Sequence, residues 1–144
     1  MKETLHLHPP APLLITYKCD ETVNIIDFNV PKNAQVLVNV WAMGRDSTIW
    51  ENPNMFIPKR FLECDINYKG NSFELIPFRA SKRICPGLPL AHRGVHLMVA
   101  SLVRNFEWKL VDGLKPEDMN MEEKFGLTLK MVQSIRVQAH MSPT

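Results

Sequence analysis

The chain has 144 residues, of which 45% are hydrophobic and 22% are charged, and this usage indicates an ordinary soluble globular domain rather than a disordered chain. Its formal net charge is only +2, which gives no reason to expect nucleic acid or a membrane surface as a partner. The three cysteines share no short metal-type spacing and no CxxC occurs, so neither a zinc site nor a disulfide framework is indicated.

A short helix is predicted over residues 1–8. Its apolar helical pattern begins at Met1, and Pro9 and Pro10 end it. The apolar h-region of a signal peptide is missing here, and no apolar run in the chain reaches the roughly 18–20 residues that cross a bilayer. We therefore expect a soluble chain with no signal and no anchor.

Residues 9–45 are predicted to be rich in β-structure. Runs of β-forming residues occupy 13–17, 23–28 and 35–40, and the segment 30–34 separates the last two like a hairpin turn. Residues 41–50 predict a short helix or turn. Residues 51–77 carry little periodicity and several loop residues, which is typical of a long meandering loop that is functional or packed around something.

One strong helix is predicted over 88–105. Its apolar residues recur at spacings of three and four and share one face; they are Ala91, Val95, Met98, Val99, Leu102 and Phe106. Residues 106–144 read as β-rich again, with runs at 106–111, 127–131 and 135–139. The predicted fold class is therefore α+β, with one dominant helix and small antiparallel pieces.

Cys85 has the most informative setting of the three cysteines. It follows the basic residues Arg79, Lys82 and Arg83 and directly precedes the long helix. Positive charge and a helix N-terminus both stabilise a thiolate, which is the form of cysteine that binds metal. These features alone leave open a structural cysteine beside a solvated basic face.

The order of residues over 77–87 resembles the haem-binding loop of cytochromes P450, in which Phe, two residues, Gly, one residue, Arg or His, one residue, Cys, one residue and Gly follow one another. Phe78, Arg83, Cys85 and Gly87 match this pattern. Residues 3–6 stand where the family has a Glu-x-x-Arg helix, and residues 56–61 resemble its later Phe-x-Pro-x-Arg-Phe motif. The resemblance covers nearly the whole chain and is to the C-terminal part of plant microsomal members, in particular the group that includes geraniol hydroxylases.

This resemblance implies a role for each matched residue. Cys85 would be the axial ligand of the haem iron, and Arg83 would hydrogen-bond a haem propionate. Phe78 would pack beside the thiolate, and Gly87 would allow close approach at the start of the long helix. The resemblance also implies a buried structural ion-pair network, formed by Glu3, His6 and Arg60.

The chain departs from the family pattern at several positions. His6 stands in place of the arginine of Glu-x-x-Arg, Ser81 in place of the glycine before Arg83, and Arg79 where close relatives usually have another glycine. If Ser81 must adopt a positive φ, strain follows. Tyr17 stands where relatives often have Arg or His near a propionate, a further departure.

By resemblance, the function is haem-dependent monooxygenation of a small apolar, terpenoid-like substrate. The family receives its electrons from a cytochrome P450 reductase on the cytoplasmic face of the endoplasmic reticulum membrane. The distal helix that activates oxygen lies upstream of the Glu-x-x-Arg helix in the family, so we expect no catalytic residue in this chain and no activity of the chain alone. A truncated monooxygenase, a non-catalytic haem-binding module and a decayed remnant with no present function all stay open.

Two further features carry weaker signals. His92 and His96 are four residues apart on the long helix and would share one face, but no third metal ligand is near them in sequence. Residues 117–123 are acidic, and we expect them to form a solvated surface loop.

Overall fold

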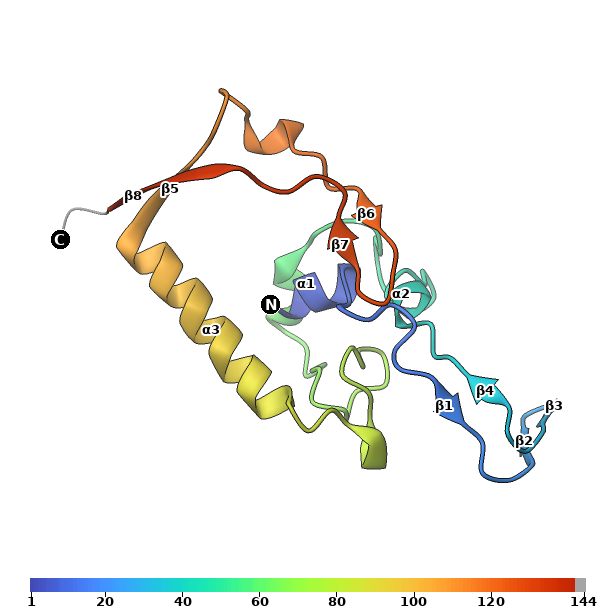
Figure 1. Ribbon diagram of the computed structural model, residues 1–144. Helices are drawn as coiled ribbons and strands as arrows, with labels where there is room; N and C mark the ends of the chain where they lie inside the picture. The colour runs from blue at the N-terminus through green and yellow to red at the C-terminus, as the bar shows by residue number, and fades with distance from the viewer. Residues whose placement is uncertain (142–144) are drawn as a thin grey trace. The chain divides into compact units, whose positions relative to one another are not determined.

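The computed structural model describes residues 1–141 and divides the chain into two compact units (Figure 1). Unit 1 comprises Met1–Ile84 together with Phe125–Leu129, and unit 2 comprises Cys85–Lys124 and Lys130–Thr144. No helix among residues 1–141 has both the length and the apolar character that crossing a membrane requires.

The helices of unit 1 are short. Helix α1 (Lys2–Leu7) ends where the N–H of His8 donates to the carbonyl of Thr4, at 2.8 Å, and the prolines that follow cannot continue it. Helix α2 (Val40–Met43) begins at Asn39, whose side chain accepts a hydrogen bond from the N–H of Ala42. Two 3₁₀ turns, η1 (Pro58–Phe61) and η2 (Ser81–Arg83), interrupt the otherwise irregular segments.

The strands of unit 1 form two antiparallel pairs, and their order corrects one prediction. Strand β1 (Tyr17–Lys18) pairs with β4 (Gln35–Val36), whereas β2 (Val23–Ile25) pairs with β3 (Phe28–Val30). The run 23–28, predicted as one strand, therefore contains the hairpin turn itself. No glycine or proline marks that turn in the sequence. Ile26 instead adopts φ 53° there, a conformation uncommon for a β-branched residue.

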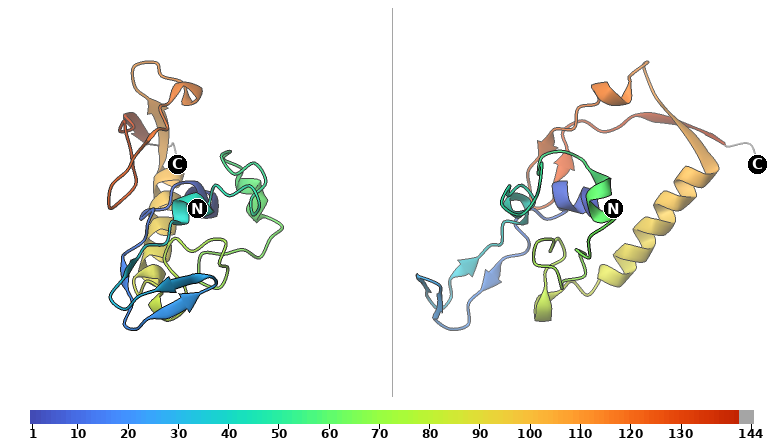
Figure 2. Two further views of the ribbon diagram at one scale, coloured as in Figure 1. Left: turned by 90° about the vertical axis from the view of Figure 1, so that its right-hand side faces the viewer. Right: turned by 180° about the vertical axis from the view of Figure 1, so that it is seen from behind.

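The segment 30–34, predicted as the hairpin turn, joins β3 to β4 instead. The N–H of Asn33 donates to the carbonyl of Cys19, at 2.8 Å, and the N–H of Cys19 donates to the carbonyl of Ala34, at 3.0 Å. These bonds extend the β1–β4 ribbon. Figures 1 and 2 show the β2–β3 hairpin at the end of this ribbon, away from α1 and α2.

Unit 2 contains the longest helix, α3 (Leu88–Asn105), which leads directly into β5 (Phe106–Leu110). Strand β5 pairs antiparallel with β8 (Val137–Met141), and β6 (Glu123–Lys124) pairs with β7 (Lys130–Met131). The 3₁₀ turn η3 (Pro116–Asp118) lies between β5 and β6. The predicted run 127–131 is thus mostly a turn, since only its last two residues are in a strand.

The apolar core lies almost entirely in unit 1, around α1 and the segments that follow it. Its buried hydrophobic residues are Leu5, Leu7, Leu14, Cys19, Val40, Trp50, Phe61, Tyr68 and Leu75. Among the described residues of unit 2, the one buried hydrophobic side chain is Leu88. Most of the apolar face predicted for the long helix is exposed, with 63% of Met98 and 53% of Val99 accessible to solvent, whereas Ala91 and Phe106 are half-buried.

Candidate functional site

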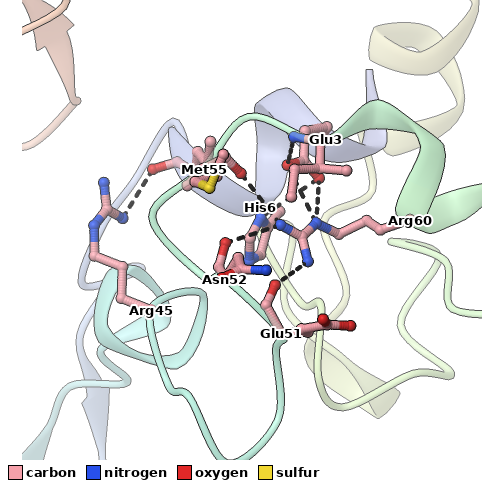
Figure 3. Close-up of polar contacts among 9 residues, drawn as sticks. Glu3, His6, Arg45, Glu51, Asn52, Met55 and Arg60 are labelled. Atoms are coloured by element: carbon pink, nitrogen blue, oxygen red, sulfur yellow. Dashed lines mark hydrogen bonds and ion pairs between the residues drawn. The ribbon is translucent and has the colours of Figure 1, made fainter.

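Glu3, on the first turn of α1, is the centre of a buried polar network in unit 1 (Figure 3). Its side chain is 2% exposed. One carboxylate oxygen accepts the backbone N–H of Ile57 at 2.6 Å, and the Nε of Arg60 lies 3.2 Å and 3.1 Å from the two oxygens. A carboxylate this deeply buried needs such partners, because an isolated charge in an apolar interior is costly.

Arg60 also binds the backbone of the meandering loop. Its two terminal nitrogens donate to the carbonyls of Glu51, at 2.5 Å, Asn52, at 3.1 Å, and Met55, at 3.2 Å. The planar guanidinium can serve all of these acceptors at once, which a lysine ammonium cannot do with the same geometry. Glu3 and Arg60 together therefore fix the loop 51–61 against α1, as Figure 3 shows.

His6 lies beside this network, and its ring packs against aromatic rings without forming a hydrogen bond within residues 1–141. It is 1% exposed, and its ring centroid lies 4.3 Å from that of Trp50 and 6.4 Å from that of Phe61. Its Nδ1 is 3.6 Å from a carboxylate oxygen of Glu3, and neither ring nitrogen has a hydrogen-bond partner within residues 1–141. Burial lowers the pKa of His6 below its ordinary value of 6.5, and the Glu3 carboxylate opposes this only in part.

The lowered pKa of His6 predicts how the stability of unit 1 depends on pH. Below about pH 6.5 the unfolded chain binds a proton at His6 that the folded chain does not, so stability falls as the pH falls, until the folded pKa is passed. Urea unfolding at about pH 7.5 and pH 5.5 should show this loss, and His6→Phe, which keeps an aromatic ring, should reduce it. An equal loss in both proteins would contradict the prediction.

Arg45 also belongs to this region, although no motif or spacing in the sequence points to it. Its guanidinium donates to the carbonyl of Leu7, at 2.9 Å, and to that of Trp41, at 3.4 Å. Its Cζ lies 4.0 Å from the centre of the Trp41 ring. Arg45 therefore satisfies a carbonyl at the C-terminal end of α1, one residue after His6, whose ring nitrogens have no hydrogen-bond partner within residues 1–141.

The part of the cysteine loop that belongs to unit 1 contains two residues in the left-handed region. Arg79 has φ 67° and Ser81 has φ 51°. These are the two positions at which the family resemblance leads one to expect glycine. Arg79 and Ser81 therefore have a Cβ in a backbone conformation that is unfavourable for residues other than glycine. The ring of Phe78 packs on that of Tyr68, with centroids 6.2 Å apart.

Gly70 of the meandering loop lies directly against this part of the cysteine loop. It has φ 85°, and a Cβ added there would come within 2.8 Å of Ile84 Cδ1 and 3.3 Å of the Cα of Ala80. Only glycine suits both this conformation and this spacing. The meandering loop is therefore packed on the backbone of the cysteine loop within unit 1.

An apolar cavity of about 250 Å³ lies beside the same loop in unit 1. Its walls come from the β1–β4 ribbon, the segment before it and the cysteine loop; they are Leu14, Ile15, Tyr17, Val36, Val38, Ile76, Arg79, Ala80 and Arg83. The guanidinium of Arg83 lies over the ring of Tyr17, with Cζ 5.1 Å from the centroid. Arg83 and Tyr17 therefore line one site.

Unit 2 begins with Cys85, which carries a half-buried, free thiol. The N–H of Leu88, the first residue of α3, donates to the carbonyl of Cys85 at 3.1 Å. At Gly87 an added Cβ would lie 3.7 Å from the Cys85 sulfur, in ordinary van der Waals contact. Glycine at position 87 therefore places no side-chain atom against the sulfur.

Within the described part of the chain, the two histidines of α3 belong to no cluster that could hold a metal ion. His96 Nδ1 is 2.6 Å from the carbonyl of His92, and their ring centroids are 4.4 Å apart. Within residues 1–141, no group of three or more His, Cys, Asp or Glu side chains could hold a metal ion.

Comparison with known proteins identifies relatives along nearly the whole chain. A chain named cytochrome P450 76T24, from Catharanthus roseus, is 56% identical over 137 residues, which are 95% of this chain and 28% of that relative. The geraniol 8-hydroxylase of the same plant is 54% identical over 136 residues, covering 94% of this chain and 28% of the relative. This chain therefore spans little more than a quarter of the length of these curated relatives.

A solved structure of a zebra fish cytochrome P450 with abiraterone matches the fold with a TM-score of 0.82 and 27% identity, over 99% of this chain and 32% of that one. The family model for cytochrome P450 matches residues 1–135. These residues include the Glu3–Arg60 network and the cysteine loop. The α+β class predicted from the sequence is that of a part of this fold, and the chain belongs to the cytochrome P450 family.

Proposed function

We propose that the chain is the haem-binding, C-terminal part of a plant monooxygenase, with Cys85 as the thiolate ligand of the haem iron. The substrate class we propose is a small apolar terpenoid, supported by 54% identity to a relative named geraniol 8-hydroxylase. Electrons would come from a cytochrome P450 reductase at the cytoplasmic face of the endoplasmic reticulum membrane, as the family resemblance implies.

The residues of this chain suit the chemistry of haem, which is an apolar macrocycle with two carboxylates. In unit 1, the cavity of about 250 Å³ has mostly apolar walls and includes the guanidinium of Arg83. Within residues 1–141, no carboxylate pairs with Arg83, which is therefore available to a propionate. In unit 2, Cys85 has a free and partly exposed thiol, the group that a haem-thiolate centre needs.

Bound haem with a thiolate ligand supplies the chemistry of oxygen activation. The proposed roles of this chain are binding and orientation: Cys85 holds the iron, Arg83 holds a propionate, and Gly87 places no side-chain atom against the sulfur. Phe78, whose ring packs on Tyr68, would give the cysteine loop an apolar anchor. The Glu3–Arg60 network would fix the meandering loop, on which the cysteine loop is packed through Gly70.

A second candidate function is haem binding without catalysis. It is favoured by the fact that every role proposed for these residues is in holding the cofactor, while the chain spans 28% of its relatives' length. Incubation of the chain with reductase and geraniol distinguishes the two candidates. We expect no hydroxylated product from the chain alone, and robust turnover would overturn that expectation.

The test of the proposal is a haemin titration of the full chain, followed by reduction under carbon monoxide and absorption spectroscopy. We expect the red-shifted carbonyl band of thiolate ligation in the unaltered protein and its loss in Cys85→Ala. Cys64→Ala is the matched control, since Cys64 is also a free, half-buried cysteine. Persistence of the band in Cys85→Ala, or its loss in Cys64→Ala as well, would contradict the assignment of Cys85.

A further inference from the structure

Arg79 is a feature of the unit 1 cavity that the proposed function does not use. Its backbone lies in the left-handed region, which costs conformational energy for a residue other than glycine. Its N–H donates to the carbonyl of Ile76 at 3.0 Å, so the turn that holds it there is formed. Strained backbone conformations of this kind cluster at ligand-binding and active sites, which favours a functional role for the Arg79 side chain.

The side chain of Arg79 reaches a segment far from it in the chain. The guanidinium donates to the carbonyl of Ile15, 64 residues earlier in the chain, and both residues line the cavity. A guanidinium has five N–H donors. Within residues 1–141, the bond to the Ile15 carbonyl is the one hydrogen bond that the Arg79 guanidinium donates. The remaining donors are available to an acceptor in the cavity.

The cavity therefore has two guanidinium groups in a mostly apolar wall. Within residues 1–141, neither Arg79 nor Arg83 is paired with a carboxylate. Arg83 is placed by the Tyr17 ring and Arg79 by the Ile15 carbonyl, so each is held by a group that does not neutralise its charge. Two positive groups beside apolar walls suit a ligand that is apolar over most of its surface and carries two negative charges.

We propose that Arg79 is a second anion-binding residue of this cavity and, with Arg83, binds the two carboxylates of a porphyrin. The proposal deepens the proposed function and rests on it for the identity of the ligand. It explains why a charged side chain occupies a strained position: the left-handed backbone directs Arg79 into the cavity wall. Ser81, which is strained in the same way, is exposed and does not line the cavity.

Metal-free protoporphyrin IX and its dimethyl ester separate this proposal from the role of Cys85, because binding of a metal-free porphyrin needs no thiolate. Each is titrated into the full chain, with quenching of tryptophan fluorescence as the readout. We expect the diacid to bind about ten-fold or more tightly than the ester, as a charge-assisted hydrogen bond allows. Arg79→Gln should lose about half of this preference in free energy, because Arg83 still binds one carboxylate, and should leave the affinity for the ester unchanged.

Two further variants control for charge and for folding. Lys82→Gln removes the same charge from an exposed side chain of the same turn that does not line the cavity, and we expect it to keep the preference. Arg79→Lys keeps the charge and should keep much of the preference.

The proposal is overturned if Arg79→Gln binds the diacid as tightly as the unaltered chain, or weakens diacid and ester equally, which is the sign of a structural role. Absence of any preference for the diacid in the unaltered chain overturns it too. A thiolate carbonyl band lost in Cys85→Ala, alongside such a result, would show that this proposal alone had failed.

Discussion

Arg60→Ala is expected to lower the free energy of unfolding of unit 1 by about 3–5 kcal/mol, the cost of removing one partner of a buried ion pair. The substitution leaves the Glu3 carboxylate, 2% exposed, without its cation, and it also leaves three loop carbonyls without their donors. A loss of this size is a large part of the 5–15 kcal/mol by which domains are usually stable. Urea unfolding followed through the fluorescence of buried Trp50 measures it.

An exposed ion pair of the same chain provides the matched control. Arg136 and Asp112 are 3.3 Å apart, but their side chains are 74% and 75% exposed. Solvent screens such a pair, so Arg136→Ala should cost unit 2, to which both residues belong, no more than about 1 kcal/mol, followed through Trp108 of β5. Arg60→Lys should fall between the two, because one ammonium cannot serve Glu3 and the loop carbonyls together. Similar losses of unfolding free energy for Arg60→Ala and Arg136→Ala would show that burial does not set the strength of these ion pairs.

Gly44→Ala should be destabilising by about 1–3 kcal/mol or more, the usual cost of forcing atoms into a packed interior. A Cβ at position 44 would lie 2.3 Å from the carbonyl oxygen of His6 and 3.4 Å from its carbonyl carbon. These are backbone atoms of α1, which cannot rotate aside as a side chain can. The expected result is a lower urea midpoint for unit 1.

The sign of this effect is informative, because Gly44 has φ −68° and alanine would suit that backbone conformation. Replacing glycine by alanine at such a position ordinarily stabilises a protein. Gly94, inside α3, has nothing within 4 Å of an added Cβ. Gly94→Ala should therefore raise the stability of α3, by about 1 kcal/mol. A Gly44→Ala variant as stable as the unaltered chain would show that α1 is not packed on position 44.

The parts of the fold that the sequence predicted well are those in which local pattern decides the outcome. Helix α3 could be predicted because its apolar residues repeat with the helical period over 18 residues. The same period could not show that this face is exposed, since coverage depends on which other elements pack there. The hairpin at Ile26 was missed because no turn residue marks it, and the positive φ of a β-branched residue has no sequence signal.

The candidate site shows the same division between local pattern and tertiary contact. Motif order singled out Glu3 and Arg60, and the structure brings them together over a separation of 57 residues. The family pattern predicts a glycine at position 81, where a positive φ would strain a serine, and Ser81 has φ 51° in the structure. Arg45 could not be predicted, because its carbonyl partners belong to two different helices and a lone arginine after a short helix resembles any solvated one.

The reach of the Glu3–Arg60 network has a consequence for the order in which unit 1 folds. The contacts of Glu3 join it to residues 54 and 57 positions later, so the intervening chain must be brought together before they form, against loop-closure entropy. Helix α1 has six residues, too few to persist alone in water. We infer that α1 forms only as it docks on a meandering loop already close to its final path, which makes this contact of high sequence separation a late and slow event in folding.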